Sequence, residues 1–142
     1  MAEQVNIFID NKPGRLNAVT AILRDHDIDI RAMTIADHRD YGVAKLLVND
    51  PHAAQRALAE HGFAAALQSV LAVAIADRPG GLHALLEILA QHAMNVQDAY
   101  GFVAVPGQRA IWCMEVAEPA AAASLIAAAG LEVLDDSELY RP

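Results

Sequence analysis

The chain has 142 residues, enough for one ordinary domain or two small ones, and its 55% apolar content excludes a disordered protein. Its formal net charge of −8 opposes nucleic-acid phosphates and anionic lipid surfaces, so we expect neither as a partner. Polar residues, Pro or Gly interrupt the apolar stretches well before membrane-spanning length, and the amino terminus lacks a signal-peptide pattern. These features predict a soluble, cytoplasmic protein.

The first half of the sequence alternates between the periods of strands and helices. Apolar residues occupy every second position in 5–9, and they recur at helical spacing in 16–23. Two apolar runs on either side of His38-Arg39-Asp40 predict an antiparallel hairpin, and Asp50-Pro51 is typical of a helix start. The predicted elements are strand 5–9, helix 13–26, strands 29–37 and 41–48, helix 51–61 and strand 63–67.

The second half repeats this order. Its predicted elements are strand 70–76, helix 79–92, strands 95–104 and 109–116, helix 119–129 and strand 131–135. Each half is therefore βαββαβ, which predicts an α+β protein of two ferredoxin-like units, with antiparallel sheets and helices packed on one face. We place the units at residues 1–68 and 69–142, and we expect no flexible linker because residues 67–70 are too few and too apolar for a flexible tether.

A strand-to-helix elbow occurs once in each half. The first elbow is Asn11-Lys12-Pro13-Gly14-Arg15-Leu16, and the second elbow is Asp77-Arg78-Pro79-Gly80-Gly81-Leu82. Their shared pattern, in the same structural context, indicates a tandem repeat. In each elbow the proline suits the first position of a helix, and the next glycine allows a ligand to approach the backbone closely. Because both repeats share the Gly80 position and a β-branched side chain would crowd the elbow backbone, we expect Gly80→Val to damage binding and folding more than Gly81→Ala.

The two elbows, with Asp29-Ile30 and Asn95-Val96 at the starts of the following strands, resemble the ACT domain. The resemblance covers nearly the whole chain, twice. It implies βαββαβ modules that bind an amino acid between copies and serve as sensors or regulatory subunits. It also implies that the elbow of one copy meets the second-strand start of another, which would pair Asn11 with Asn95 and Asp77 with Asp29.

The chemistry of a free amino acid suits such a site. Backbone N–H groups at 14–16 or 80–82, at a helix start, are expected to be unpaired and to favour the ligand carboxylate, and Asn11 or Asp77 can accept from the ammonium. Facing carboxylates repel each other, so we favour the site that pairs Asn11 with Asn95. The candidate ligand-binding residues are Asn11, Pro13, Gly14, Arg15, Leu16, Asp29, Ile30, Asp77, Pro79, Gly80, Gly81, Leu82, Asn95 and Val96.

The residues before the elbows bear on the ligand. Serine-regulated phosphoglycerate dehydrogenases, which this arrangement resembles, carry a histidine two residues before the elbow asparagine. The corresponding positions here are Ile9 and Ile75. This difference removes a polar contact and implies a ligand with an apolar side chain.

The remaining reactive and aromatic residues have structural interpretations. His26 and His92 are predicted at helix ends, and the dispersed His38, His52, His61 and His83 favour solvated surface histidines over a metal site. Cys113, between Trp112 and Met114, is predicted to be a buried small hydrophobe rather than a nucleophile. Tyr100, Phe102 and Trp112 fill a core or a subunit interface, or alternatively form an aromatic rim beside a ligand pocket.

The sequence contains no catalytic triad, metal cluster, phosphate loop or carboxylate pair at catalytic spacing. We therefore expect no catalytic residue, no metal and no cofactor. The leading hypothesis is a non-catalytic, amino-acid-responsive regulatory protein that forms a homodimer or higher homo-oligomer and acts on a metabolic enzyme. A structural scaffold without a ligand is the alternative, and an enzyme comes third.

Overall fold

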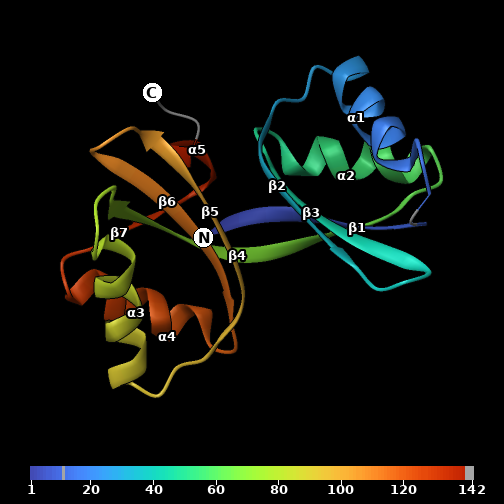
Figure 1. The fold of residues 1–142 in the computed structure, drawn as a ribbon. Coiled ribbons are helices and arrows are strands. Elements are labelled where there is room, and N and C mark those ends of the chain that lie inside the picture. Colours follow the sequence, from blue (N-terminus) through green and yellow to red (C-terminus); the bar gives the residue numbers. More distant parts are fainter. Residues whose placement is uncertain (11, 140–142) are drawn as a thin grey trace. The chain divides into compact units, whose positions relative to one another are not determined.

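The computed structural model describes residues 1–10 and 12–139. These residues form two compact units (Figure 1). The first unit comprises residues 3–68, and the second comprises the described residues from 69 onward together with Met1 and Ala2. The boundary falls inside one strand, β4 (Ala64–Ala76), so each unit includes part of β4.

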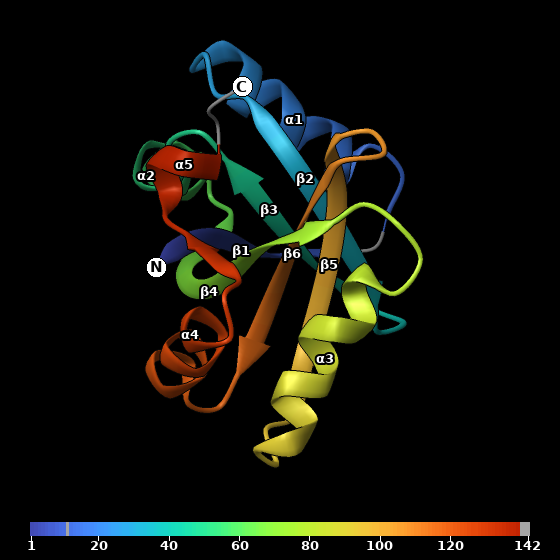
Figure 2. The ribbon, with the colours of Figure 1, turned by 90° about the vertical axis from the view of Figure 1, so that its left-hand side faces the viewer.

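The first unit contains β1 (Ala2–Asp10), α1 (Arg15–Asp25), β2 (Ile30–Asp37), β3 (Tyr41–Val48) and α2 (Pro51–Glu60) before β4. Its strands follow the order β2-β3-β1-β4, and β3 is antiparallel to both β1 and β2. Helices α1 and α2 pack side by side (Figures 1 and 2). The alternation seen in the sequence directs Val5, Ile7 and Ile9 into the core, where they meet Val19 and Leu58 of the helices.

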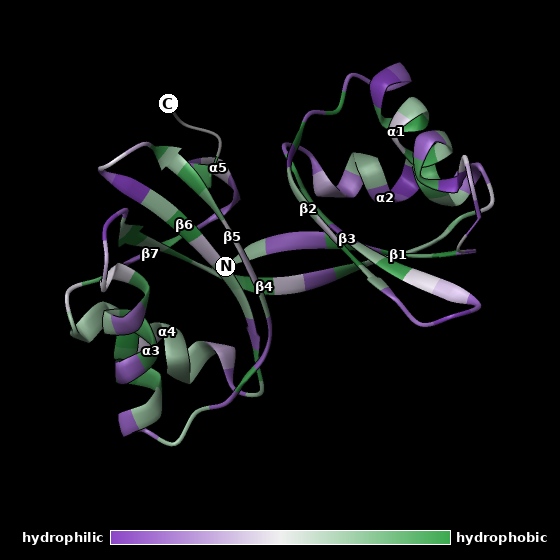
Figure 3. Ribbon diagram, viewed as in Figure 1, coloured by the Kyte–Doolittle hydropathy of each residue, from purple (hydrophilic) through white to green (hydrophobic). Residues whose placement is uncertain are grey.

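The second unit continues with α3 (Gly81–Gln91), β5 (Val96–Val105), β6 (Arg109–Val116), α4 (Pro119–Ala128), β7 (Glu132–Leu134) and α5 (Asp136–Leu139). Strand β4 pairs antiparallel with β6 and β7, and β6 pairs with β5. Polar and apolar residues alternate around α3, as expected for a helix with one buried face (Figure 3). Leu85 and Leu89 of α3 pack with Ile126 of α4 and Val73 of β4. The predicted α+β fold with two βαββαβ units is confirmed.

Several predicted boundaries were wrong. The expected strands 63–67 and 70–76 are one continuous strand, β4, because neither Gly nor Pro interrupts the chain between them. Strand β1 begins at Ala2 rather than residue 5. The short helix α5 was not predicted, and an Asp135 carboxylate oxygen accepts from the backbone N–H of Glu138 at 3.0 Å near its start.

Candidate functional site

Both elbows turn through a left-handed glycine. Gly14 has φ 86° and Gly80 has φ 85°, and each is the N-cap of the helix that follows, with no side-chain cap. The sequence suggested that Pro13 and Pro79 occupy the first helical position. The helices instead begin at Arg15 and Gly81, so both prolines lie in the turn. The left-handed glycine reverses the chain at low cost because it has no side chain.

Part of the predicted set of backbone donors is used by the turn itself. The N–H of Arg15 donates to the Lys12 carbonyl at 3.3 Å, and the N–H of Gly81 donates to the Arg78 carbonyl at 3.0 Å. The expectation that all N–H groups at 14–16 and 80–82 stay unpaired is therefore wrong. The first N–H groups that bond within the helices are those of Ala18, to the Gly14 carbonyl, and Ala84, to the Gly80 carbonyl. The N–H groups of Leu16 and Leu82 come before these, so they can donate to a ligand.

Gly81 is the more constrained of the two glycines in the second elbow. A Cβ at residue 81 would lie 2.0 Å from the Ala76 carbonyl oxygen, whereas a Cβ at Gly80 would meet nothing within 4 Å. Whether Gly80→Val is more damaging than Gly81→Ala stays a prediction, because Gly80 has a left-handed φ of 85° and a methyl group at 81 meets the Ala76 carbonyl oxygen. Repeat identity pointed to Gly80, but the close approach of the α3 start to the end of β4 is particular to the second elbow.

Asp77 has an internal partner. Its Oδ2 accepts from the Gly107 N–H at 2.7 Å, and its own N–H donates to the Gln108 carbonyl at 3.2 Å. Both bonds tie the β5–β6 turn to the second elbow. The matching turn of the first unit, between β2 and β3, makes its bond within the turn: the Arg39 N–H donates to Asp37 Oδ1 at 3.0 Å. Asn11, the counterpart of Asp77, lies outside the described residues.

Arg15 of the first elbow lies over an aromatic ring. Its Cζ is 4.9 Å from the centroid of Phe63, and its Nε is buried without a hydrogen-bond partner in the part of the chain that the structure describes. A buried, unpaired guanidinium nitrogen is costly unless a group outside these residues accepts from it. The corresponding position of the second elbow is Gly81, so the two elbows differ in charge.

The second-strand starts lie far from the elbow of their own unit. Helix α3 separates the second elbow from Asn95 and Val96 (Figure 1). Its 11 residues span about 16 Å. Helix α1 separates the first elbow from Asp29 and Ile30 in the same way. Within a unit, the structure therefore brings the elbow residues together but not the elbow and the second-strand start.

An apolar pocket of about 240 Å³ opens beside the second elbow. Ile75 and Leu82 line it from the elbow side, and Gly101, Val103 and Trp112 line it from β5 and β6. Gly101 stands opposite Trp112 in the sheet, and a Cβ there would lie 2.6 Å from Trp112 Cε3. The sequence analysis did not include Gly101, although a glycine inside a strand pattern signals a close approach.

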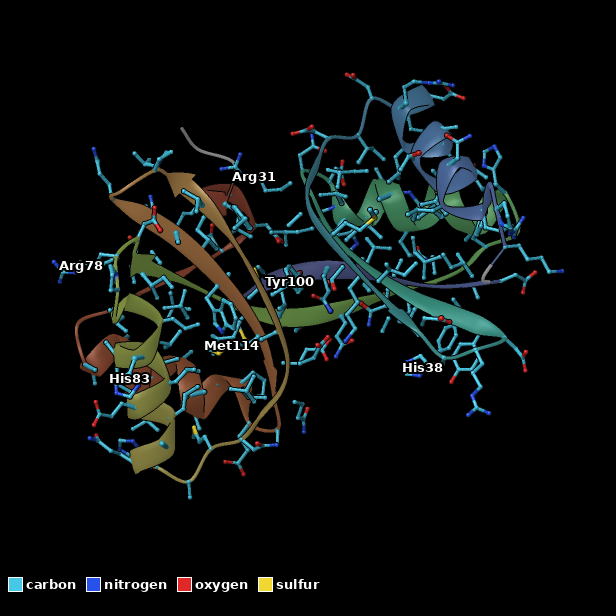
Figure 4. The ribbon with its side chains drawn as sticks, in the orientation of Figure 1. Arg31, His38, Arg78, His83, Tyr100 and Met114 are labelled. Carbon is cyan, nitrogen blue, oxygen red and sulfur yellow. The ribbon has the colours of Figure 1, made fainter. Side chains whose placement is uncertain are left out.

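Cys113 and Tyr100 stand opposite each other on β6 and β5 of the second unit. Cys113 is buried, as predicted, and burial raises the pKa of its thiol to about 12. Burial also raises the pKa of Tyr100, which has a side-chain hydrogen bond to Cys113 across the strands. Figure 4 marks Tyr100, Arg78 of the second elbow and His83 of α3. Among the described residues, no three His, Cys, Asp or Glu side chains lie close enough together to hold a metal.

His26, His61 and His92 are helix C-caps. Their Nδ1 atoms lie 2.8 to 2.9 Å from the carbonyl oxygens four residues earlier.

No helix in the described part of the chain is long and apolar enough to span a membrane.

Two βαββαβ units, each with a Pro-Gly elbow that has no side-chain cap, define a tandem pair of small α+β modules. The ACT domain pair family model matches residues 1–141, so the chain belongs to the ACT domain pair family. A search of curated proteins gave no match.

Solved structures share this architecture. Protein BT0572 from Bacteroides thetaiotaomicron has a TM-score of 0.92 and 28% identity, and the match covers 99% of this chain and 96% of that one. The ligand-free regulatory subunit of aspartate kinase from Thermus thermophilus has a TM-score of 0.64 and 19% identity, covering 89% and 91%. The corresponding subunit from Thermus flavus has a TM-score of 0.57 and 19% identity, covering 90% and 92%. Because the two Thermus subunits are each only 19% identical to this chain, the comparison with them shows a shared fold and nothing more.

Proposed function

We propose that this protein is a non-catalytic regulatory protein that binds a free amino acid with an apolar side chain. Its membership of the ACT domain pair family supports this proposal. So does its fold, which resembles that of a regulatory subunit of aspartate kinase. In this proposal the ligand lies between an elbow of one ACT copy and the second-strand start of another, and its binding changes the association of the protein with a metabolic enzyme.

The observation that carries the proposal is the buried, unpaired Nε of Arg15 in the first elbow. The guanidinium and the Leu16 N–H would together donate to the ligand carboxylate, and charge-assisted bonds to a guanidinium are among the strong ones. Asn11 would accept from the ammonium. Asn95 and Val96 would complete this site, with Pro13 and Gly14 shaping the approach.

The second elbow is less suited to a zwitterion. One oxygen of Asp77 is already bonded to Gly107, and Gly81 supplies no charge where Arg15 stands in the first elbow. Its Pro79-Gly80 turn, with Asp29 and Ile30 opposite, remains the alternative site. The apolar pocket beside Leu82 would then receive the ligand side chain.

A calorimetric screen of the twenty amino acids tests the proposal. We expect one or a few apolar amino acids to bind, and Arg15→Met to weaken binding roughly ten- to a hundredfold, because a hydrogen bond to a charged group contributes about 1.5–3 kcal/mol. Arg24→Met is the matched control, since Arg24 is an exposed arginine at the other end of α1 that pairs with Asp25. Absence of binding by all twenty would overturn the proposal.

A second pair of variants shows which of the two elbows binds the ligand. Leu16 and Leu82 hold equivalent positions, and each packs at the margin of its own core. If the first elbow binds the ligand, Leu16→Ala should weaken binding and Leu82→Ala should not. Trp112 is the single tryptophan and lines the pocket beside the second elbow, so a ligand-dependent change in its emission would instead assign the second elbow.

A scaffold without a ligand is the second candidate function, and exposed apolar residues on the strands favour it. Phe8 is 57% exposed, Tyr41 44% and Val103 52%. Such surfaces mark contacts with other chains. A scaffold would form the homo-oligomer without responding to any amino acid in the calorimetric screen.

A further inference from the structure

The side chains of His26 and His61 lie next to each other in the first unit. Their ring centroids are 5.9 Å apart, and their ring planes meet at 88°. His26 is the C-cap of α1 and His61 is the C-cap of α2, two helices that pack against each other. Both residues are exposed, so this His26–His61 pair can be reached from solvent.

A backbone hydrogen bond fixes which nitrogen of each ring carries the proton. His26 Nδ1 lies 2.8 Å from the Ile22 carbonyl oxygen, and His61 Nδ1 lies 2.8 Å from the Ala57 carbonyl oxygen. A carbonyl oxygen only accepts, so Nδ1 of each ring carries the hydrogen and Nε2 of the neutral ring keeps its lone pair. In metal sites a ligating histidine donates its other ring N–H in the same way, which fixes the ring orientation and raises the basicity of the ligand nitrogen.

The spacing of the two rings suits a shared ion. With metal–nitrogen bonds of about 2.1 Å, two imidazoles on one ion have ring centroids roughly 5–6 Å apart. The observed 5.9 Å lies within that range. Among the described residues, no third His, Cys, Asp or Glu lies close enough to complete a three-residue site, so water would fill the remaining positions. Imidazole ligands suit Zn²⁺, Cu²⁺ or Ni²⁺, whereas Mg²⁺ and Ca²⁺ prefer oxygen.

The second repeat lacks one member of the pair. His92 is the C-cap of α3 and matches His26, with Nδ1 2.9 Å from the Ile88 carbonyl oxygen. The C-cap of α4, which matches His61, is Ala129. A C-cap histidine therefore occurs without a partner in the same fold, and the pairing of two such histidines is particular to the first unit.

We propose that His26 and His61 bind one divalent transition-metal ion, with Nε2 of each ring as a ligand. The ion would link the end of α1 to the end of α2. This site uses no residue of either elbow or of either second-strand start, and neither histidine lines the pocket around Asp29 at the start of β2. It is therefore independent of the proposed amino-acid site.

Titration of the untagged full-length protein with ZnCl₂, followed by calorimetry and by NMR of the imidazole signals, tests the proposal. We expect one Zn²⁺ per chain, with saturable shifts of the His26 and His61 rings, and no such shifts with MgCl₂ as the control. His61→Asn should weaken Zn²⁺ binding roughly tenfold or more, because it removes one of the two ligands. The asparagine amide can still donate to the Ala57 carbonyl. His92→Asn makes the same change at the end of α3 and should leave Zn²⁺ binding unchanged.

Three results would overturn the shared site: equal shifts with Mg²⁺, Zn²⁺ shifts spread evenly over all six histidines, or unchanged Zn²⁺ affinity in His61→Asn. His26→Asn is a second variant and should weaken binding as much as His61→Asn, since both rings bind the same ion. A loss in only one of these two variants would assign the ion to a single histidine and so also contradict the proposal. The amino-acid screen is read separately, without added metal. Failure of the elbow site therefore leaves the metal site standing, and the reverse also holds.

Discussion

The carboxylate of Asp77 accepts the backbone N–H of Gly107 at 2.7 Å, across 30 residues of sequence. This bond fastens the β5–β6 turn to the second elbow. Asp77→Ala should therefore cost about 1 kcal/mol, because the bond is exposed, and it should accelerate hydrogen exchange at the Gly107 amide. Asp77→Asn keeps an oxygen acceptor and is the control. Equal protection of the Gly107 amide in the alanine variant and the parent would contradict this role.

Gly81→Ala should destabilise the protein more than Gly80→Ala. The added methyl group at 81 would lie 2.0 Å from the Ala76 carbonyl oxygen, so the elbow must move, and we expect a loss of about 3 kcal/mol or more. An alanine at 80 would meet no other atom, and its only cost is the left-handed backbone conformation, about 1–2 kcal/mol. Urea unfolding of both variants gives the comparison, and a smaller loss for Gly81→Ala would show that the elbow adjusts freely.

Cys113 should make stability fall in alkaline solution. Burial raises its pKa from 9.0 to about 12, so the unfolded chain loses this proton before the folded protein does. The contribution of the thiol to stability is then present in full below pH 9 and declines between pH 9 and 12. Cys113→Ala should show a shallower decline in unfolding free energy over this range. Cys113 also contributes to the raised pKa of Tyr100, after burial, so the difference between the two proteins reports the coupled Cys113–Tyr100 pair.

Local patterns predicted most of the fold. The repeat, the helices and the hairpin turns follow from apolar period and from Pro, Gly and Asp at the turns, because these depend on neighbours in sequence. The continuity of β4 was missed because one predicted strand ended at Leu67 and the next began at Val70, although an extended backbone tolerates the two polar residues between them.

The candidate site was predicted less completely. Three contacts of the site depend on segments that folding brings together. They are the hydrogen bond from the Gly107 N–H to Asp77, the packing of Arg15 over Phe63, and the closeness of the Ala76 carbonyl oxygen to residue 81. No local pattern contains these distances. The pairing of Asn11 with Asn95 remains a prediction, since it joins different ACT copies and Asn11 lies outside the described residues.

We expect the protein to form a homodimer or a higher homo-oligomer. Phe8 and Tyr41 are exposed on neighbouring strands with ring centroids 5.8 Å apart, and His38 stacks on Tyr41 at 5.2 Å. This exposed aromatic group is a natural contact for a second copy. Light scattering at micromolar concentration should give at least twice the chain mass, and Phe8→Asp should reduce it. Val103→Asp tests the β5 edge, and a monomeric mass for the parent would exclude both surfaces.

We also expect a single cooperative unfolding transition. The two units share β4, with residues 64–68 in the first unit and 69–76 in the second, and no Gly or Pro separates the two parts. Loss of either unit would remove support from a strand that the other also uses, so calorimetric and van't Hoff enthalpies should agree.

Trp112 allows a sharper test of this cooperativity, because the only tryptophan lies in the second unit. Val19→Ala, in the fully buried core of the first unit, should cost about 2 kcal/mol. If the units unfold together, this change moves the denaturation midpoint that Trp112 fluorescence reports. Leu85→Ala, in the core of the second unit, is the positive control, since it must move that midpoint in either case. If Leu85→Ala shifts the denaturation midpoint reported by Trp112 fluorescence and Val19→Ala does not, the two units unfold independently.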